Sequence, residues 1–280
     1  MPRATVAIFA HNEERRIARC IESLPLLSDA FEFHILVNGS TDRTADIARC
    51  LTAHLPHVYV HDLPHGGKAR TWNHFVDSIF VDSTPACLFV DGDAEIMPGA
   101  LEAMTAALAD NPEANGVNAM PVTGRKQNAY RATMIADHGI FGALYGLSGD
   151  FVRRLKASAI RLPNDLVGDD GLIGALAKTD LGPEADWDKT RIINCPAAEF
   201  AFEETDWRVP TTWALQARRM VNYSVRRYQN RVISAIMRGP GPAALPETMR
   251  ETYAEHWHAF DIRPRFAAFD WLAKRRMKRQ

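Results

Sequence analysis

Cysteine is scarce in this sequence, and its few copies stand far apart. Cys20, Cys50, Cys87 and Cys195 are the four cysteines, and no two of them form a Cys-x-x-Cys pair. This spacing argues against a zinc site and against a disulfide framework, and it favours a reducing compartment.

Long apolar runs are missing as well. No stretch approaches the roughly 18–20 consecutive apolar residues with which a helix crosses a bilayer. The first four residues lead directly into a β-branched segment, without the apolar region of a signal peptide. We therefore expect a cytoplasmic protein that is at most peripheral at the inner face of a membrane.

Neither sign of charge is in excess. Lys and Arg number 33 against 34 Asp and Glu, and the net charge of −1 makes no general case for nucleic-acid binding. The exception is the end of the chain, where residues 274–280 hold five cations and no acid. Apolar residues make up 46% and charged residues 24% of the 280 residues, which is ordinary for one or two globular domains with a full core.

What the first half does contain is a regular alternation of short apolar segments and amphipathic segments. A first helix is expected after residue 10, with Asn12 as its N-cap and two acids in its first turn. A series of this kind predicts a parallel sheet with right-handed crossovers. The expected strands are residues 5–10, 33–37, 58–60, 87–91 and 117–122. The later helices are 45–55, a helix through 72–79 that follows a loop at 65–68, and 100–108.

After Gly124 the alternation ends and helices dominate. We expect an α/β domain over residues 1–205 and a helical C-terminal extension over 206–280. The expected segments are an amphipathic helix within 125–147, a turn at 147–150, a loop passing into a helix over 164–177, strands at 191–195 and 199–202, a basic helix at 211–237, a linker at 239–242, and helices at 246–260 and 264–279.

Two carboxylates follow the apolar strand at residues 87–91. Asp91 and Asp93 lie two positions apart, so their side chains share one face of an extended segment, and Gly92 lets a ligand approach the backbone. Ligands of open α/β sheets bind at the carboxyl ends of strands. Carboxylates at this spacing suit Mg²⁺ or Mn²⁺, particularly an ion shared with substrate phosphates. The alternative is a strand end followed by an ordinary polar turn.

Five short motifs in this order resemble family 2 glycosyltransferases, and the resemblance covers roughly residues 4–220. One departure is Met220, which stands where the Gln-x-x-Arg-Trp pattern has Trp; another is Asn38, where many relatives carry Asp. The motifs are Ile8-Phe9-Ala10-His11-Asn12-Glu13-Glu14, Leu36-Val37-Asn38-Gly39-Ser40-Thr41-Asp42, Gly66-Gly67-Lys68, Asp91-Gly92-Asp93, and Gln216-Ala217-Arg218-Arg219-Met220, with Asp169-Asp170 similar to the family's acidic pair.

The resemblance implies the GT-A fold and the transfer of a sugar, with inversion, from a nucleoside diphosphate donor to a hydroxyl acceptor, either a glycan or a lipid-linked molecule. It implies Asp170 as the base, with Asp169 beside it. Two adjacent acids repel each other, which raises one pKa toward the working range. Asp93 would hold the divalent metal, with Asp91 at the ribose or at the metal.

The remaining site residues that the resemblance implies belong to the donor. Gln216 and Arg219 would reach the diphosphate, the arginine through bidentate contacts. Asn38 can offer both a donor and an acceptor to a pyrimidine edge, which favours a UDP-sugar. The nucleotide-binding residues are Ala10, Asn12, Glu13, Asn38, Lys68, Asp91 and Gly92.

Other interpretations of these residues stay open at this point. Asp169 and Asp170 would then only cap a helix, Lys68 would be a solvated loop lysine, and the arginines near residue 219 a solvated helix face. A haloacid-dehalogenase-like phosphatase also pairs Asp-x-Asp with a later Gly-Asp. Glu95 and Ile173 stand where that class requires other residues, and the first 80 residues would stay unexplained. A catalytically silent nucleotide-sugar-binding protein is the third alternative, against which the intact acids argue.

The end of the chain interleaves aromatic residues with cations. Such a helix can lie in a membrane interface, with cations against anionic lipid. The alternative is that the aromatic residues pack on the catalytic domain. The apolar residues in question are Phe266, Phe269, Trp271, Leu272 and Met277, among Arg263, Arg265, Lys274, Arg275, Arg276, Lys278 and Arg279.

Overall fold

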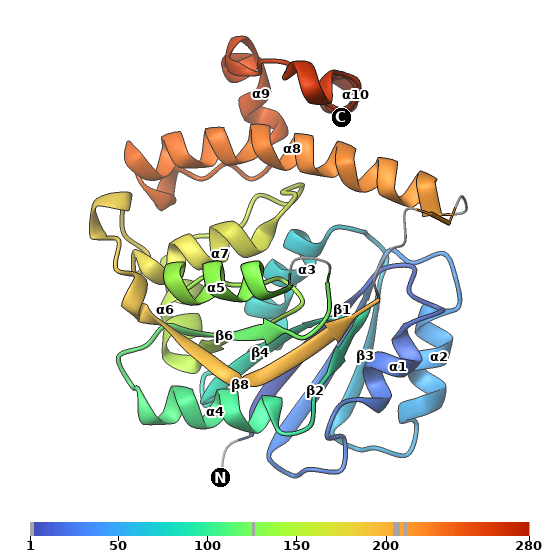
Figure 1. The fold of residues 1–280 in the computed structure, drawn as a ribbon. Helices are drawn as coiled ribbons and strands as arrows, with labels where there is room; N and C mark the ends of the chain where they lie inside the picture. Colours follow the sequence, from blue (N-terminus) through green and yellow to red (C-terminus); the bar gives the residue numbers. More distant parts are fainter. Residues whose placement is uncertain (1–2, 125–126, 204–207, 210–211, 280) are drawn as a thin grey trace.

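The computed structural model describes residues 3–124, 127–203, 208–209 and 212–279. The expected domain boundary at 205/206 and the expected helix start at 211 lie outside the described residues. An eight-stranded sheet is flanked by helices on both faces, and a group of C-terminal helices lies across one edge of it (Figure 1). The expected α/β class with a helical C-terminal extension is confirmed.

Most expected elements are present, with shifted ends. The strands are β1 (Ala4–Ala10), β2 (Phe31–Asn38), β3 (Val58–Leu63), β4 (Ala86–Asp91), β5 (Ala94–Ile96), β6 (Gly116–Pro121), β7 (Leu144–Ser148) and β8 (Ile192–Phe202). The helices are α1 (Ile17–Glu22), α2 (Thr44–Thr52), α3 (Lys68–His74), α4 (Ala100–Asp110), α5 (Gln127–Asp137), α6 (Gly149–Ser158), α7 (Asp169–Lys178), α8 (Trp213–Arg238), α9 (Arg250–His256) and α10 (Ala267–Arg279).

The sheet is mixed rather than wholly parallel. Its strand order is β3-β2-β1-β4-β7-β6-β8-β5. The first four strands run parallel, as expected, and β8 runs parallel to β6. β7 is antiparallel to β4 and β6, and β5 is antiparallel to β8. Leu144, at the start of β7, lies opposite Val90, near the end of β4. The segment with α5 therefore joins the end of β6 to the start of β7 at the same edge of the sheet, and β7 runs back across it.

Two sequence predictions in the middle of the chain are wrong. The expected helix over 125–147 ends at Asp137, and residues 144–148 form a buried strand instead. The turn expected at 147–150 is a helix start: the Ser148 hydroxyl accepts a hydrogen bond from the Phe151 N–H and caps α6. A single strand, β8, also covers the two strands expected at 191–195 and 199–202.

Side chains of the central strands point alternately into two cores. Ala7 and Phe9 of β1 face a core that includes α3, α6 and α7, whereas Val6 and Ile8 face a core that includes α1, α2 and α4. In β4, Phe89 faces the α3 side. Asp91, two residues later, therefore leaves the sheet on the same side as α3 and α7.

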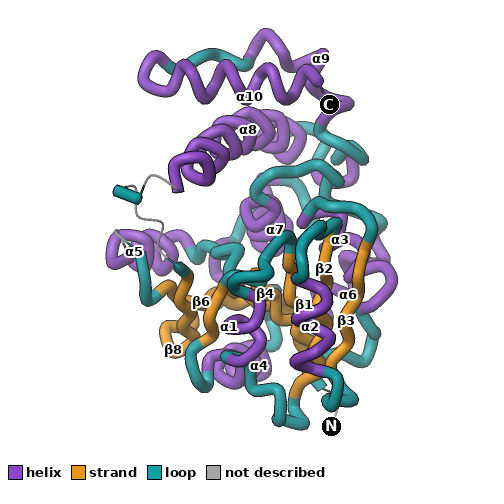
Figure 2. Tube along the Cα trace, turned by 90° about the vertical axis from the view of Figure 1, so that its right-hand side faces the viewer, coloured by secondary structure: helices purple, strands orange, loops and turns teal. Residues whose placement is uncertain are grey.

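The long helix α8 crosses the edge of the sheet at which β1 and β4 end (Figure 1). The buried Gln229 ties α8 to two segments. Its side chain accepts a hydrogen bond from the Val167 N–H, before α7, at 2.8 Å, and it donates one to the Tyr253 hydroxyl, on α9, at 2.8 Å. α10 lies on the far side of α8 (Figure 2), where Arg263 contacts the fully buried Asp270 at 2.7 Å. The C-terminal helices are thereby fixed over the strand ends.

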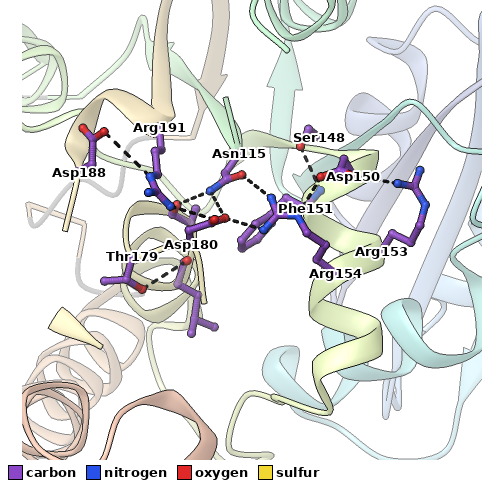
Figure 3. Close-up of polar contacts among 12 residues, drawn as sticks. Asn115, Ser148, Asp150, Phe151, Arg153, Arg154, Thr179, Asp180, Asp188 and Arg191 are labelled. Carbon is purple, nitrogen blue, oxygen red and sulfur yellow. Dashed lines mark hydrogen bonds and ion pairs between the residues drawn. The ribbon is translucent and has the colours of Figure 1, made fainter. Parts of the chain in front are cut away.

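A polar network fixes the end of α7 that is remote from this edge (Figure 3). Arg154 of α6 contacts Asp180 at 2.6 Å and donates to the Asn115 side-chain oxygen at 2.9 Å. Asn115 donates to Asp180 at 2.9 Å, and Arg191 contacts the same carboxylate at 3.1 Å. Because two arginines and the Asn115 amide hold the Asp180 carboxylate, two residues beyond α7, they anchor this end of the helix.

All four cysteines are free. Cys20, Cys87 and Cys195 are buried, and Cys50 on α2 is exposed. Burial raises the pKa of the Cys20 and Cys87 thiols well above the ordinary value. Within the described residues, no helix combines the length and the apolar character that crossing a membrane requires.

Candidate active site

Lys68 lies between acids from two elements. Its Nζ is 2.6 Å from Asp91 Oδ1, at the end of β4, and 3.6 Å from Asp169 Oδ2, at the start of α7. It also donates to the Gly142 carbonyl at 3.1 Å. Burial alone lowers the pKa of Lys68, but Asp169 and Asp91 outweigh it and raise the pKa above its ordinary value. The alternative of a solvated loop lysine is wrong.

Burial also affects Asp91. It raises the pKa of Asp91 to about 7, against the opposing effect of Lys68. The Asp93 carboxylate contributes to this raised pKa, so the two acids of the Asp-Gly-Asp motif lie within electrostatic reach of each other.

Asp93 has a different cation beside it. Arg16 Nη1 is 3.2 Å from Asp93 Oδ2, and Arg16 Nη2 is 2.6 Å from Glu13 Oε2. Burial first and Asp93 second raise the pKa of Glu13 to about 7. Glu13, Asp91 and Asp93 thus form an acidic group that two cations only partly neutralise, and an additional cation would be stabilised there.

The predicted role of Asn12 as a helix cap is wrong. α1 begins only at Ile17, without an acid in its first turn. Asn12 has a φ of 55°, a left-handed conformation that asparagine tolerates. Its side-chain oxygen accepts a hydrogen bond from the Thr41 N–H at 2.9 Å, and its own N–H donates to the Ser40 hydroxyl at 3.0 Å. Asn12 therefore joins the loops that follow β1 and β2.

Asn38 connects three segments at the same edge. It is buried at the end of β2, where its side-chain nitrogen donates to the Ala10 carbonyl at 3.0 Å. Its side-chain oxygen accepts from the Gly67 N–H at 3.3 Å. These contacts hold the ends of β1 and β2 against the loop that carries Lys68.

The acidic pair at 169 and 170 begins α7, but neither side chain caps the helix. The N-cap is Gly168. Asp169 is buried, whereas Asp170 is 17% exposed and accepts hydrogen bonds from the Gly171 N–H at 2.9 Å and from Arg226 Nη2 at 2.8 Å.

Arg226 is a site residue to which the sequence analysis gave no role. A Cβ added to Gly168 would lie 2.4 Å from Arg226 Nε, so the missing side chain lets the guanidinium pass over the loop to Asp170. Gln216 and Arg219 also lie on α8, and Gln216 donates to the Thr212 hydroxyl at 2.8 Å. Arg226 follows Arg219 by seven residues, or about two turns, on the same helix face. This spacing from Arg219 was the sequence signal that could have pointed to Arg226.

Trp72 and Tyr145 lie beneath the site, and the sequence analysis gave no role to either of them. Trp72 Nε1, the Tyr145 hydroxyl and Asp169 Oδ2 are buried polar atoms that make no hydrogen bond within the described part of the chain. Burial and then Asp169 raise the pKa of Tyr145 well above its ordinary value. Trp72 on α3 and Tyr145 on β7 are aromatic residues in apolar segments, and such residues give no sequence signal of a position beside a buried acid.

A metal site with a full set of protein ligands is not preformed. Among residues 3–124, 127–203, 208–209 and 212–279, no three His, Cys, Asp or Glu side chains form a group that could hold an ion. Asp91 and Asp93 are two hard oxygen ligands beside Glu13, and small divalent ions in nucleotide sites commonly take their other ligands from phosphates and water. The residues present fit such a shared ion.

The sequence matches the model of a protein family, described as glycosyl transferase family 2, over residues 5–159, more than half of the chain. The chain belongs to this family. The prediction from the motifs is confirmed, and the phosphatase alternative is set aside. No curated protein matches the sequence.

Solved structures of other glycosyltransferases share the fold. The mannosyltransferase PcManGT from Pyrobaculum calidifontis, in complex with GDP-Man and Mn²⁺, is 18% identical with a TM-score of 0.60, over 97% of this chain and 74% of that one. Glucosyl-3-phosphoglycerate synthase from Mycobacterium tuberculosis, with Mn²⁺, UDP and glucosyl-3-phosphoglycerate, is 17% identical with a TM-score of 0.56, over 86% and 81%. At these identities the likeness shows the GT-A fold.

Proposed function

We propose that this glycosyltransferase moves the sugar of a nucleoside diphosphate sugar to a hydroxyl acceptor with inversion and with the help of a divalent cation. One observation carries the proposal: Lys68 joins Asp91, at the end of β4, to Asp169, at the start of α7. This contact brings the end of β4, which we assign to the donor, close to the start of α7, where we assign the base, and open α/β sheets bind their ligands at such an edge.

The donor phosphates belong beside the acidic group. Asp93 and Asp91 would hold Mg²⁺ or Mn²⁺, which supplies neutralisation of the charge on the departing diphosphate. The two solved relatives described above contain Mn²⁺, which supports this choice. Gln216 and Arg219 would contact the diphosphate from α8, the arginine in bidentate fashion.

The nucleoside belongs at the ends of β1 and β2. Ala10, Asn12, Glu13 and Asn38 surround this point, and Gly92 packs against β1 so closely that a Cβ would lie 2.9 Å from Ala10 Cβ. We retain a UDP-sugar as the preferred donor. The fixed Asn12 and Asn38 side chains preorganise the loops that form the pocket.

Asp170 is the proposed base. It would accept the proton of the acceptor hydroxyl while that oxygen bonds to the sugar carbon and the diphosphate leaves from the opposite side. Asp169 is held by Lys68 and acts as a fixed neighbouring charge. The acceptor is a glycan or a lipid-linked molecule.

We also propose a peripheral contact with the cytoplasmic leaflet through α10. Trp271 and Leu272 are exposed, and Arg275 lies over the Trp271 ring at 5.4 Å. Met277 is buried against the protein and takes no part. Exposed aromatic and aliphatic side chains beside arginines are suited to an anionic headgroup region.

The proposed function is tested by donor binding and turnover. Unfolding temperatures are measured with UDP-, GDP- and other nucleoside diphosphate sugars, with and without Mn²⁺. A donor at 100 times its Kd should stabilise the protein by about 2.7 kcal/mol. The Asp93→Ala variant should lose the metal-dependent part of this stabilisation. If that variant kept the turnover and the metal response of the wild type, the metal assignment would be wrong.

A further inference from the structure

A groove of about 500 Å³ lies along α8, and its lining is strongly basic. None of the described residues that line it is an acid. Four of those residues are arginines, which gives the groove an unusual density of guanidinium groups for one helix. The lining includes Tyr223, Arg226, Arg227, Asn230, Arg231 and Arg238.

Acidic side chains outside the groove lining hold these arginines in place. Arg227 Nη2 donates to both oxygens of Asp261 at 2.8 Å, and Arg231 Nη1 contacts the same carboxylate and donates to the Ala259 carbonyl at 2.6 Å. Arg238 contacts Glu184 at 3.0 Å. Because each guanidinium has five N–H groups, these contacts order the side chain and still leave donors for a ligand.

Arg226 connects the groove to the proposed base. It lines the groove and also donates to Asp170 at 2.8 Å. The groove therefore begins one side chain away from the point at which an acceptor hydroxyl must lie. A molecule with its hydroxyl at Asp170 would extend directly among the arginines.

We propose that this groove binds an anionic group of the acceptor, a phosphate or a carboxylate, while the acceptor's hydroxyl lies at Asp170. The inference rests on the proposed function and names the acceptor's chemical class. Arginine pairs bind such groups through parallel charge-assisted hydrogen bonds. Tyr223, which is 60% exposed, adds a hydroxyl and a ring face at the mouth of the groove. The phosphate can belong to a soluble ester or to a lipid-linked acceptor, since the recognising chemistry is the same.

Calorimetric titration with glycerol 3-phosphate tests the inference, with glycerol as the neutral match. Both are titrated into the full chain saturated with nucleoside diphosphate and Mn²⁺, so that the donor phosphate site is filled. Glycerol 3-phosphate should bind and glycerol should not. Arg231→Gln should weaken binding at least tenfold, whereas Arg49→Gln, which removes an arginine paired with Asp62 at 2.8 Å on α2, should not.

A second variant distinguishes a loss of binding from a loss of folding. Asn230 is exposed in the groove, and Asn230→Asp keeps its shape while adding a negative charge. It should also weaken glycerol 3-phosphate at least tenfold without changing the unfolding temperature. Binding that neither groove variant weakens, or no binding beside a normally bound nucleotide, overturns the inference and leaves the proposed function standing. Glycerol 3-phosphate binding by a chain that binds no nucleotide supports the groove as an anion site and overturns the proposed function.

Competition identifies the source of the phosphate once groove binding is established. Vesicles of phosphatidic acid in phosphatidylcholine are added to the complex with glycerol 3-phosphate. Displacement by these vesicles, but not by vesicles of phosphatidylcholine alone, supports a lipid-borne phosphate, and retention of glycerol 3-phosphate supports a soluble one.

Discussion

At the scale of single residues, Asp170 carries the sharpest expectation. Asp170→Asn should lower transfer by about 10²–10⁴-fold, the usual contribution of a positioned base, because an amide cannot accept the acceptor proton. Donor affinity should change little, since this carboxylate meets the acceptor. Steady-state kinetics and nucleotide calorimetry measure the two effects separately. Asp169→Asn should be the milder change, and the reverse ranking would assign the base to Asp169.

Glu13 should make stability depend on pH. The folded protein keeps the Glu13 proton up to a pKa of about 7, whereas an unfolded chain releases it near 4.5. Unfolding between these values releases a proton, so the free energy of unfolding falls as pH rises from about 4.5 to 7. Over this pH interval, the free energy of unfolding should fall by about 3 kcal/mol at most.

Glu13→Gln removes this titration. Urea unfolding of wild type and variant at several pH values should show the wild type losing stability relative to the variant as pH rises. Parallel curves for the two proteins would contradict the raised pKa.

The sequence predicted those site residues whose position follows from strand ends. Asp91 was expected at the carboxyl end of a buried strand, whereas the acidic pair at 169 and 170 was expected from the resemblance. Lys68 lies between Asp91 and Asp169. Arg226 and Tyr145 could not be placed this way. The position of Arg226 depends on the loop at Gly168, and the burial of Tyr145 depends on α3 and α7 packing over β7. Contacts of this kind are tertiary: helical spacing puts Arg226 on the face of Arg219 but does not show that it meets Asp170.

At the scale of elements, the loop before α7 packs closely against Arg226 of α8. Gly168 has a φ of 91° and would clash with Arg226 if it carried a Cβ. Gly168→Ala should therefore destabilise the protein by more than the roughly 1–2 kcal/mol of left-handed strain alone. It should also displace Arg226 from Asp170.

Two other glycines supply matched controls for this loop. Gly99→Ala imposes left-handed strain with open space around the new Cβ, and it should cost only about 1–2 kcal/mol. Gly171→Ala meets Arg226 Nη2 at an ordinary 3.6 Å within α7, and it should be neutral or stabilising by up to about 1 kcal/mol. Thermal unfolding of the three variants gives the ranking. Equal losses at Gly168 and Gly99 would mean that the contact with Arg226 contributes nothing.

Elements with a clear period were predictable, and short or locally ambiguous ones were not. The first four β-strands and α8 were found because their apolar patterns run long enough to distinguish them. Residues 144–147 were assigned to a helix because a brief apolar run fits either period, and pairing with β4 and β6 decides for a strand. β5 has only three residues and exists because β8 pairs with it.

At the scale of the whole molecule, the C-terminal helices share a core with the sheet. One cluster of buried side chains runs from Phe89 and Leu172 into Val232 of α8 and Met277 of α10. The proposed division at 205/206 thus separates segments of chain that bury each other's apolar surface. We expect them to unfold together.

Binding of the whole molecule to a membrane through α10 is a prediction at the same scale. Vesicles that contain anionic lipid should sediment the full chain at low salt, and added salt should release it, because screening weakens the attraction of the arginines. A variant carrying Trp271→Ser and Leu272→Ser should sediment several-fold less. Tyr59→Ser, which removes an exposed aromatic on β3, is the control. A full chain that ignores anionic vesicles would end the membrane proposal.

The unequal burial of the cysteines has a practical consequence. Only the Cys50 thiol is exposed, and it lies on α2, on the α1 side of the sheet rather than among the acids at the strand ends. A thiol-reactive dye or surface should therefore attach to the unaltered protein at one place, since reaction needs an accessible thiolate. Tethered in this way, each molecule would present α8 and its groove in the same direction, and encounters with single acceptors could be followed one at a time.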